Sequence, residues 1–390
     1  MEKPKIRFRI FNNKWKKNKL DKVVDFFDNQ RIPIDSSERK SGPYPYYGAS
    51  GIIDYVDDFI FSGEYVLLAE DGANIILRSS PIAYLSKGKF WLNNHAHIMR
   101  MKTGSNEFLI QLLEKQNYEK YNTGTAQPKL NGEVVKNITL HFPSDDEQSA
   151  IGTLFCTLDD LLASYKDNLA NYQSLKATML AKMFPKTGQR VPEIRLDGFK
   201  GEWKKSKLKD VAHRVQGNDG RMDLPTLTIS ASGGWMNQID RFSANIAGKE
   251  QKNYTLLKKG ELSYNHGNSK LAKYGVVFEL QDYEEALVPK VYHSFRVNQL
   301  ANAKFIEIMF STKIPDRELG KLVSSGARMD GLLNISFDDF MNIAIIIPTI
   351  EEQQAIGTYF SNLDNLIVAH QEKISQLETL KKKLLQDMFI

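Results

Sequence analysis

The chain contains two copies of one long stretch of its own sequence. Residues 147–184 align without a gap with residues 352–389, and 15 of these 38 positions are identical. A shorter repeat joins residues 4–20 to residues 192–208. The two offsets are 205 and 188 residues, so the second copy holds 17 more residues between its shared ends. Self-similarity of this kind indicates two structural units built on one plan, with shared ends and divergent middles.

Each copy of the longer repeat opens like a helix. Ser144 precedes Glu147 by three residues, and Thr349 stands in the same relation to Glu352, which is the spacing of a reciprocal capping box. Apolar residues then recur at intervals of three and four, as in a coiled coil. The residues that we expect in the helix pairing are Leu154, Leu158, Leu161, Leu169, Tyr172, Leu363, Leu366, Ile374, Leu377 and Leu384.

The length of these helices bears on how they pack. A helix of about 38 residues is about 57 Å long at ~1.5 Å per residue, which exceeds typical globular helices. We therefore expect the two helices to pair with each other as a spacer. The alternative is that each helix packs separately on its own domain.

The divergent middles indicate mixed α/β structure. Short β-rich runs bounded by Gly, Asp and Asn predict strands at residues 52–56, 65–69, 75–77 and 276–278. A helix is expected near residues 105–116, and residues 185–192 read as a linker. The fold class expected is α+β, with two tandem mixed α/β domains, each followed by a long helix. The helices are expected to pair as an antiparallel coiled coil with pseudo-two-fold symmetry.

Composition limits the class of protein. The 390 residues are 42% hydrophobic and 25% charged, which is typical of globular proteins. The single cysteine, Cys156, cannot form an internal disulfide, and residues 1–9 are basic with no apolar segment behind them. These features favour a cytoplasmic protein.

Familiar catalytic patterns do not occur in the sequence. It has no phosphate-binding Gly-rich loop, no His-Glu-x-x-His and no Gly-x-Ser-x-Gly. His95 and His97 are two residues apart, which places them on one face of a strand. They could form a metal pair, but without a Cys or acidic partner nearby a hydrogen-bonded structural role is the stronger interpretation.

Several loops instead suit DNA reading. Basic clusters can contact phosphates, and small polar residues, amides and tyrosines can reach bases. The competing interpretations are a solvated surface for the lysines and tight turns with packed rings for the tyrosines. The candidate DNA-binding residues are Lys16, Lys17, Tyr46, Tyr47, Ser50, Arg78, Thr123, Thr125, Gln127, Lys129, Lys204, Lys205, Asn265, Asn268, Ser269, Lys270, Ser325 and Arg328.

The repeat and its motifs resemble a known family. The features that carry the resemblance are the segment Pro192–Arg195 with Phe199 and Trp203, the loop at residues 123–131, and the paired Pro-x-x-x-Glu/Glu-Gln helix starts. Their order and duplication resemble the specificity subunits of type I restriction-modification systems, over essentially the whole chain. The resemblance implies target recognition domains at residues 1–143 and 200–348, spacer helices at 144–184 and 349–390, and a linker at 185–199.

The resemblance also implies function and partners. Each recognition domain would read one half of a split double-stranded DNA target, and the half-sites would differ because the middles differ. Two modification subunits would bind S-adenosylmethionine and methylate adenine, and two restriction subunits would cut DNA using ATP and Mg. This chain is expected to be non-catalytic and to bind no cofactor or metal itself. The alternatives are a stand-alone bipartite DNA-binding regulator and an enzyme with an unrecognised site.

Overall fold

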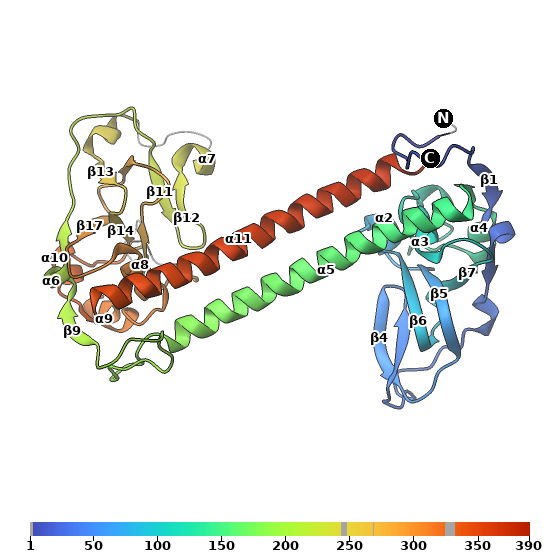
Figure 1. The fold of residues 1–390 in the computed structure, drawn as a ribbon, viewed down its shortest axis with the longest axis horizontal. Helices are drawn as coiled ribbons and strands as arrows, with labels where there is room; N and C mark the ends of the chain where they lie inside the picture. The colour runs from blue at the N-terminus through green and yellow to red at the C-terminus, as the bar shows by residue number, and fades with distance from the viewer. Residues whose placement is uncertain (1–2, 243–247, 268, 324–331) are drawn as a thin grey trace. The chain divides into compact units, whose positions relative to one another are not determined.

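The computed structural model describes residues 3–242, 248–267, 269–323 and 332–390. The chain divides into two units. Unit 1 consists of Met1–Asn168 and His370–Ile390, and unit 2 consists of Leu169–Ala369. Each unit therefore contains one divergent middle together with one part of each long helix (Figure 1).

Unit 1 is built on a six-stranded sheet. The strand order is β2-β7-β5-β6-β3-β4, antiparallel except where β3 runs parallel to β6. A separate two-stranded ladder pairs β1 with β8. The elements are β1 (Lys16–Lys19), α1 (Leu20–Val23), β2 (Val24–Phe26), β3 (Tyr44–Gly48), β4 (Gly51–Val56), β5 (Phe61–Ala69), α2 (Asn74–Leu77), β6 (Ala83–Leu92), β7 (Ala96–Met101), α3 (Asn106–Glu114), α4 (Gly132–Asn137) and β8 (Thr139–Phe142).

The expected elements of unit 1 are confirmed with one exception. Residues 52–56 and 65–69 lie in β4 and β5, and the expected helix is α3, capped by the Ser105 side chain. The run at 75–77 is wrong as a strand, because it lies in the one-turn helix α2. Three apolar residues are too few to distinguish strand from helix, and Arg78 ends this turn with a left-handed φ of 53°.

Unit 2 repeats the framework of unit 1 with a different middle. A four-stranded sheet has the order β10-β17-β14-β15, and β11-β12, β13-β16 and β18-β9 form two-stranded ladders. The expected strand at 276–278 is β15. The elements are β9 (Lys204–Lys207), α6 (Leu208–Val211), β10 (Ala212–Arg214), β11 (Leu227–Ser230), β12 (Gly234–Asn237), α7 (Gln238–Phe242), β13 (Thr255–Lys258), β14 (Leu262–Asn265), β15 (Val276–Glu279), β16 (Glu285–Val288), β17 (His293–Val297), α8 (Ala303–Ser311), α9 (Asp316–Leu322), α10 (Phe337–Met341) and β18 (Ala344–Ile347).

The long helices α5 (Asp145–Lys182) and α11 (Ile350–Asp387) pair in opposite directions. Within unit 1, Asp159 pairs with Lys381 and Lys166 with Glu378, so residue numbers rise along one helix as they fall along the other. The expected α+β class with paired long helices is thereby confirmed. Within unit 2 the helices are joined by Lys176 and Asp364, and these two residues are the repeat equivalents of Lys381 and Asp159.

The apolar contact between the helices in unit 1 has a clear centre. Leu158, Leu162 and Leu377 are buried there, with Ile374 and Leu384 against them. Leu161 and Leu366 are each 42% exposed, so the expectation that they lie in the buried seam is wrong. Leu162, four residues after Leu158, lies in the buried seam, whereas Leu161, three residues after Leu158, lies at the edge of the seam. Among the other expected pairing residues, Leu363 is buried, and Leu154, Leu169 and Tyr172 are partly buried.

The helix starts differ from the capping box that the sequence suggests. The backbone N–H of Glu352 does donate to Thr349 Oγ1, at 3.5 Å. The Glu352 carboxylate, however, accepts both hydrogen bonds from Arg195, at 2.7 and 2.6 Å, so the reciprocal half of the box is wrong. Glu147 accepts the same pair of bonds from Arg7, at 2.6 and 2.7 Å.

Each unit closes its core with a phenylalanine from the end of a long helix. Phe184 stacks on Phe305 and meets Trp203 edge-on in unit 2. In unit 1, Phe389 stacks on Phe108 and packs against Trp15 in the same manner. The C-terminal end of α11 thus fills in unit 1 the position that the end of α5 fills in unit 2.

Among the residues described, no helix has both the length and the apolar character needed to cross a membrane.

Candidate nucleic-acid interface

Four of the expected phosphate contacts lie on the short ladders at the start of each unit. Lys16 and Lys17 are exposed on β1, and Lys204 and Lys205 are exposed on β9. Lys17 lies opposite His141 in the ladder, and burial together with the Lys17 charge lowers the pKa of that imidazole. The ladders therefore present positive charge on the surface, which suits a polyanion.

The loop that precedes α4 in unit 1 has a closed, ordered base. The Asn122 side chain accepts from the backbone N–H groups of Gly124 and Lys129, both at 2.9 Å. The Thr123 N–H donates to the Lys129 carbonyl at 2.8 Å. A Cβ on Gly124 would lie 1.8 Å from the Gln127 carbonyl oxygen, so this position requires glycine.

The tip of this loop is open to solvent. Thr125 and Gln127 at the tip are exposed, as are the side chains of Thr123 and Lys129 at the base, and all four are expected to bind DNA. Lys129 is tethered only loosely, with Nζ 3.4 Å from Glu70 Oε1. Side chains of this kind at the tip of an ordered loop can reach bases or phosphates in a groove.

The loop rests on the segment that follows β5. The Leu130 N–H donates to the Glu70 carbonyl at 2.7 Å, and the Gly72 N–H donates to the Pro128 carbonyl at 3.0 Å. Glu70 also pairs with Arg31 at 2.6 Å. Backbone hydrogen bonds therefore hold the loop base against the segment after β5. The Glu70 side chain beside the loop belongs to a cluster of charged groups that includes Arg31.

Asp28 and His97 complete that cluster. His97 is buried, and its Nδ1 lies 2.7 Å from Asp28 Oδ2. Burial would raise the pKa of Asp28, but the hydrogen bond and charge of His97, a backbone bond from Ile98 and the Arg31 charge together hold it below its usual range. Asp28 is therefore a carboxylate at neutral pH.

The two histidines considered as a metal pair have different environments. His97 lies within β7, whereas His95 precedes the strand and is half exposed, with Nδ1 2.8 Å from Asp71 Oδ2. No group of three or more His, Cys, Asp or Glu in the described ranges is arranged to hold a metal ion. The geometry of His97 is that of a hydrogen-bonded structural residue.

One expected DNA contact is wrong, and two others make contacts within the fold. Tyr46 is 1% exposed and its hydroxyl bonds to the backbone of Ile34, so it belongs to the core. Tyr47 stacks on Tyr84 instead of facing solvent freely. Arg78 donates to the Glu114 carboxylate and carbonyl. The sequence does not show whether an aromatic or basic residue of a loop packs into the core or faces solvent. Ser50, at the β3–β4 turn, is exposed.

The expected loops of unit 2 are only partly described. Asn265 is occupied structurally, because it donates to the Ile229 carbonyl and accepts from the Gly267 N–H. Ser269 and Lys270 are exposed. Asn268, Ser325 and Arg328 lie outside the described residues.

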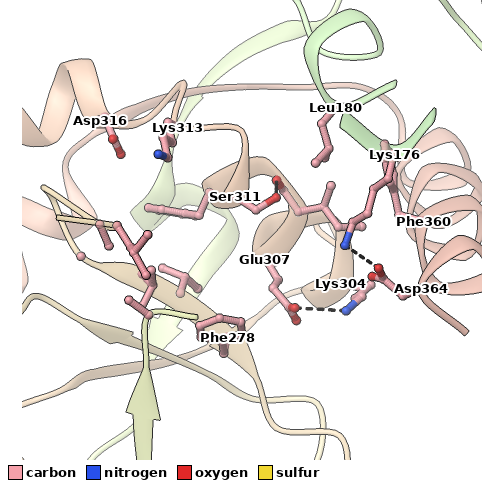
Figure 2. Close-up of a pocket in the computed structure, with 18 residues that line it drawn as sticks. Lys176, Leu180, Phe278, Lys304, Glu307, Ser311, Lys313, Asp316, Phe360 and Asp364 are labelled. Atoms are coloured by element: carbon pink, nitrogen blue, oxygen red, sulfur yellow. Dashed lines mark hydrogen bonds and ion pairs between the residues drawn. The ribbon is translucent and has the colours of Figure 1, made fainter. Parts of the chain in front are cut away.

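Unit 2 also contains a cavity of about 240 Å³ beside α8 and β15 (Figure 2). Lys304 pairs with Glu307 at 3.1 Å, and Lys176 pairs with Asp364. Much of the remaining lining is apolar, including Phe278 and Phe360. The Lys304–Glu307 pair lies within α8, and the Lys176–Asp364 pair joins the two long helices, so each of these lysines is matched by a carboxylate.

The sequence did not single out Asp28, Arg31 and Glu70 as parts of the site. They lie far along the chain from the loop base that they support, and no local pattern links them to it. One feature of the sequence could have pointed to this cluster. Each divergent middle has a histidine at the equivalent position of a strand, His97 in β7 and His293 in β17. That equivalence follows from strand pairing, which a single sequence does not show.

Comparison with known proteins identifies the two repeated regions. Residues 12–171 and 200–379 each match the type I restriction modification DNA specificity domain. A putative type I restriction enzyme specificity subunit of Haemophilus influenzae is 38% identical over 133 residues, a match that spans 34% of each chain. A type I restriction enzyme specificity subunit of Methanocaldococcus jannaschii is 21% identical over 399 residues, covering 95% of this chain and 91% of that relative.

A solved structure shares the fold. The type I restriction-modification S subunit from M. genitalium matches with a TM-score of 0.65 and 14% sequence identity, covering 100% of this chain and 99% of that one. At this identity the likeness concerns the fold alone. The two matched regions together include more than half of the residues, and the chain therefore belongs to the type I restriction modification DNA specificity family.

Proposed function

We propose that the chain is the specificity subunit of a type I restriction-modification complex that reads a split, asymmetric DNA target. Unit 1 would read one half-site and unit 2 the other. The specificity subunits of this family are non-catalytic, so the chain acts by binding and placing other subunits.

The repeated framework around different middles carries this proposal. Both units use the same Arg–Glu–Trp contact and the same terminal phenylalanine. Their sheets differ in the described ranges, with six strands in unit 1 and four in the main sheet of unit 2. Equal frameworks would hold the two readers in equivalent ways, and unequal middles would recognise unequal sequences.

The surface of the long helices supports two copies of one partner. Leu161 and Leu366 are repeat equivalents and are each 42% exposed. Leu175 and Leu380 are also equivalents, at 38% and 44% exposure. Exposed leucines that recur with the repeat suit two identical modification subunits, one on each copy, better than they suit solvent. Two restriction subunits would join the complex in addition to the two modification subunits.

Cofactors are assigned to the partners in this proposal. S-adenosylmethionine would bind the modification subunits, and ATP and Mg would bind the restriction subunits. The complex would work in the cytoplasm, where its DNA lies.

The test is adenine-methylation mapping by long-read sequencing. A host expressing this chain with its cognate modification subunit is compared with a host expressing the modification subunit alone. A new split motif that depends on this chain is the expected result. Complex formation without any new motif would contradict the proposal and would favour a stand-alone DNA-binding regulator.

A further inference from the structure

His97 makes a second hydrogen bond that the DNA-reading proposal does not use. Its Nε2 lies 2.8 Å from the carbonyl oxygen of Leu130, the last residue of the loop before α4. The ring is buried on β7, so the bond runs from the core to the loop. The next residue, Asn131, caps α4 with its side chain. His97 therefore fixes the point at which the loop ends and the helix begins.

Unit 2 contains the same bond. His293 Nε2 lies 2.9 Å from the carbonyl oxygen of Ile335, and the next residue, Ser336, caps α10 with its side chain. Strand pairing makes His97 and His293 equivalent, because each lies four residues before the strand residue that opposes the start of β2 or β10. The middles have diverged around this contact, yet both units have it.

Apart from this bond, the surroundings of the two rings differ. Both nitrogens of His97 face oxygens, the Leu130 carbonyl and the Asp28 carboxylate, and both oxygens accept hydrogen. Both bonds form together when each ring nitrogen carries a hydrogen. His293 instead stacks on His266, with the ring centroids 4.7 Å apart. The bond to the loop carbonyl is therefore the feature that the units share.

We propose that His97 is a positioning residue for the loop at residues 122–130, and that its bond to the Leu130 carbonyl sets how that loop meets its half-site. Glu70 and Gly72 hold the loop from the β5 side, and His97 holds it from β7. Two anchors on neighbouring strands restrain the loop base in two directions, so its exposed tip is presented in one orientation. The inference rests on the proposed function, because it assumes that this loop reads DNA.

A matched pair of substitutions separates the two hydrogen bonds of His97. In His97→Asn the amide nitrogen can occupy the place of Nδ1 and donate to Asp28, but nothing reaches Leu130. In His97→Gln the amide nitrogen can occupy the place of Nε2 and donate to the Leu130 carbonyl. Both variants remove the ring, and each can keep one of its two bonds, so faster loop exchange in His97→Asn than in His97→Gln assigns the restraint to the Leu130 bond and the reverse order assigns it to the Asp28 bond.

Two measurements are made on the full chain in complex with its modification subunit. Hydrogen exchange followed by mass spectrometry reports the loop peptide, and methylation rates are measured on the mapped target and on targets with one substituted base pair in either half-site. We expect faster exchange at residues 122–130 in His97→Asn. We also expect a roughly fivefold loss of discrimination at one half-site only, the size of effect of one hydrogen bond. His97→Gln should restore both.

The equivalent pair at the second histidine is the control. His293→Asn and His293→Gln should leave discrimination at the first half-site unchanged. Equal loop exchange in the two His97 variants would overturn the inference, while chain-dependent methylation of a split motif would leave the proposed function standing. Faster exchange in His97→Asn with full discrimination at both half-sites would also overturn it. If the variants are too unstable to purify, a 15N spectrum of the wild-type chain in which His97 Nε2 carries no hydrogen would do the same, because the bond to the Leu130 carbonyl requires one.

Discussion

At the scale of single residues, the most informative contact is the ion pair that each unit repeats. Glu147 is 1% exposed, and it accepts two bonds from Arg7 and one from Trp15 Nε1, at 3.4 Å. The unit 2 counterparts are Glu352, Arg195 and Trp203. A buried pair of this kind costs desolvation, so its worth lies in fixing one geometry more than in added stability. It attaches the segment before the first strand to the start of the long helix.

Removing the charge of Glu147 alone should lower the stability of the fold, although the intact pair adds little to it. We expect Glu147→Gln to lower the free energy of unfolding by about 3 kcal/mol, because Arg7 would remain partly buried without its counter-ion. Asp146→Asn is the control, since Asp146 is exposed in the same helical turn and should change stability by less than about 0.5 kcal/mol. Chemical denaturation of the full chain measures both, and equal values would show that the pair contributes nothing specific.

The pH dependence of stability should carry a contribution from His293. Burial lowers the pKa of His293 to about 4, opposed by the bond to Ile335 and assisted by the charges of His266 and Arg214. The unfolded chain takes up this proton near pH 6.5, whereas the folded chain does so only near pH 4. The contribution is therefore complete above about pH 6.5 and is lost as the pH falls toward about 4, by up to about 3 kcal/mol.

The comparison with His293→Gln isolates this contribution from the many carboxylates that titrate in the same range. The difference in unfolding free energy between wild type and variant should shrink by up to about 3 kcal/mol between about pH 7 and about pH 4. A difference that stays constant over this range would mean that the buried imidazole is protonated in the folded chain as readily as in the unfolded one.

The lysines on the short ladders give a prediction about salt. Replacing Lys16, Lys17, Lys204 and Lys205 with glutamine should reduce the salt dependence of DNA binding, by about 0.9 in the log–log slope for each phosphate group that the lysines neutralise. The preferred sequence should not change, since phosphate contacts carry no base information. Titration of DNA binding at several salt concentrations measures the slope, and an unaltered slope would place these lysines away from the DNA.

At the scale of elements, the long helices show how far periodicity can be trusted. The pattern located both helices and most of the apolar seam. It placed Leu161 in the seam where Leu162 belongs, because from Leu158 a step of three and a step of four are both compatible with a helical stripe. In the structure Leu162 is 8% exposed and contributes to the buried cluster, and Leu161 is 42% exposed.

These adjacent leucines form a matched pair for testing the helix contact. Leu162→Ala should destabilise unit 1 by about 2 to 3 kcal/mol, because it leaves a cavity between α5 and α11. Leu161→Ala should cost less than about 1 kcal/mol in the free chain and should instead weaken binding of the modification subunit. Thermal unfolding and pull-down of the complex separate the two effects. The reverse order of stabilities would require a different helix register.

At the scale of the whole molecule, the two units share a framework but not a reading surface. Each middle is held between an N-terminal ladder and a long helix, and the ladders β1-β8 and β9-β18 repeat the same pairing. A middle that keeps the contact made by Phe108 with Phe389 could therefore be exchanged at these points.

Exchange of the first recognition region tests this organisation. Replacing residues 20–138 with the corresponding region of another family member should change one half of the methylated motif and leave the other half as it was. Methylation mapping of the hybrid, expressed with the same modification subunit, gives the result directly. A change in both halves would mean that the two units do not read independently.

The sequence by itself determined the larger organisation. The repeat established two units, the capping residues located the starts of α5 and α11, and the spacing of leucines predicted their pairing. These patterns are local or arise from the match between the two repeats, so they can be recognised without knowing which residues pack against them. Of the residues expected to bind DNA in unit 2, Asn268, Ser325 and Arg328 lie outside the described residues.

Tertiary structure alone decided the contacts between distant segments. No pattern in the sequence joins Arg7 to Glu147 or His97 to Leu130, which lie 140 and 33 residues apart. Nor could sequence distinguish Tyr46, buried in the sheet, from Thr125, exposed at a loop tip. Strand pairing and helix packing decide which side chains meet and which face solvent. They bring together residues that are far apart in the chain, and the local sequence around each residue does not indicate the contact.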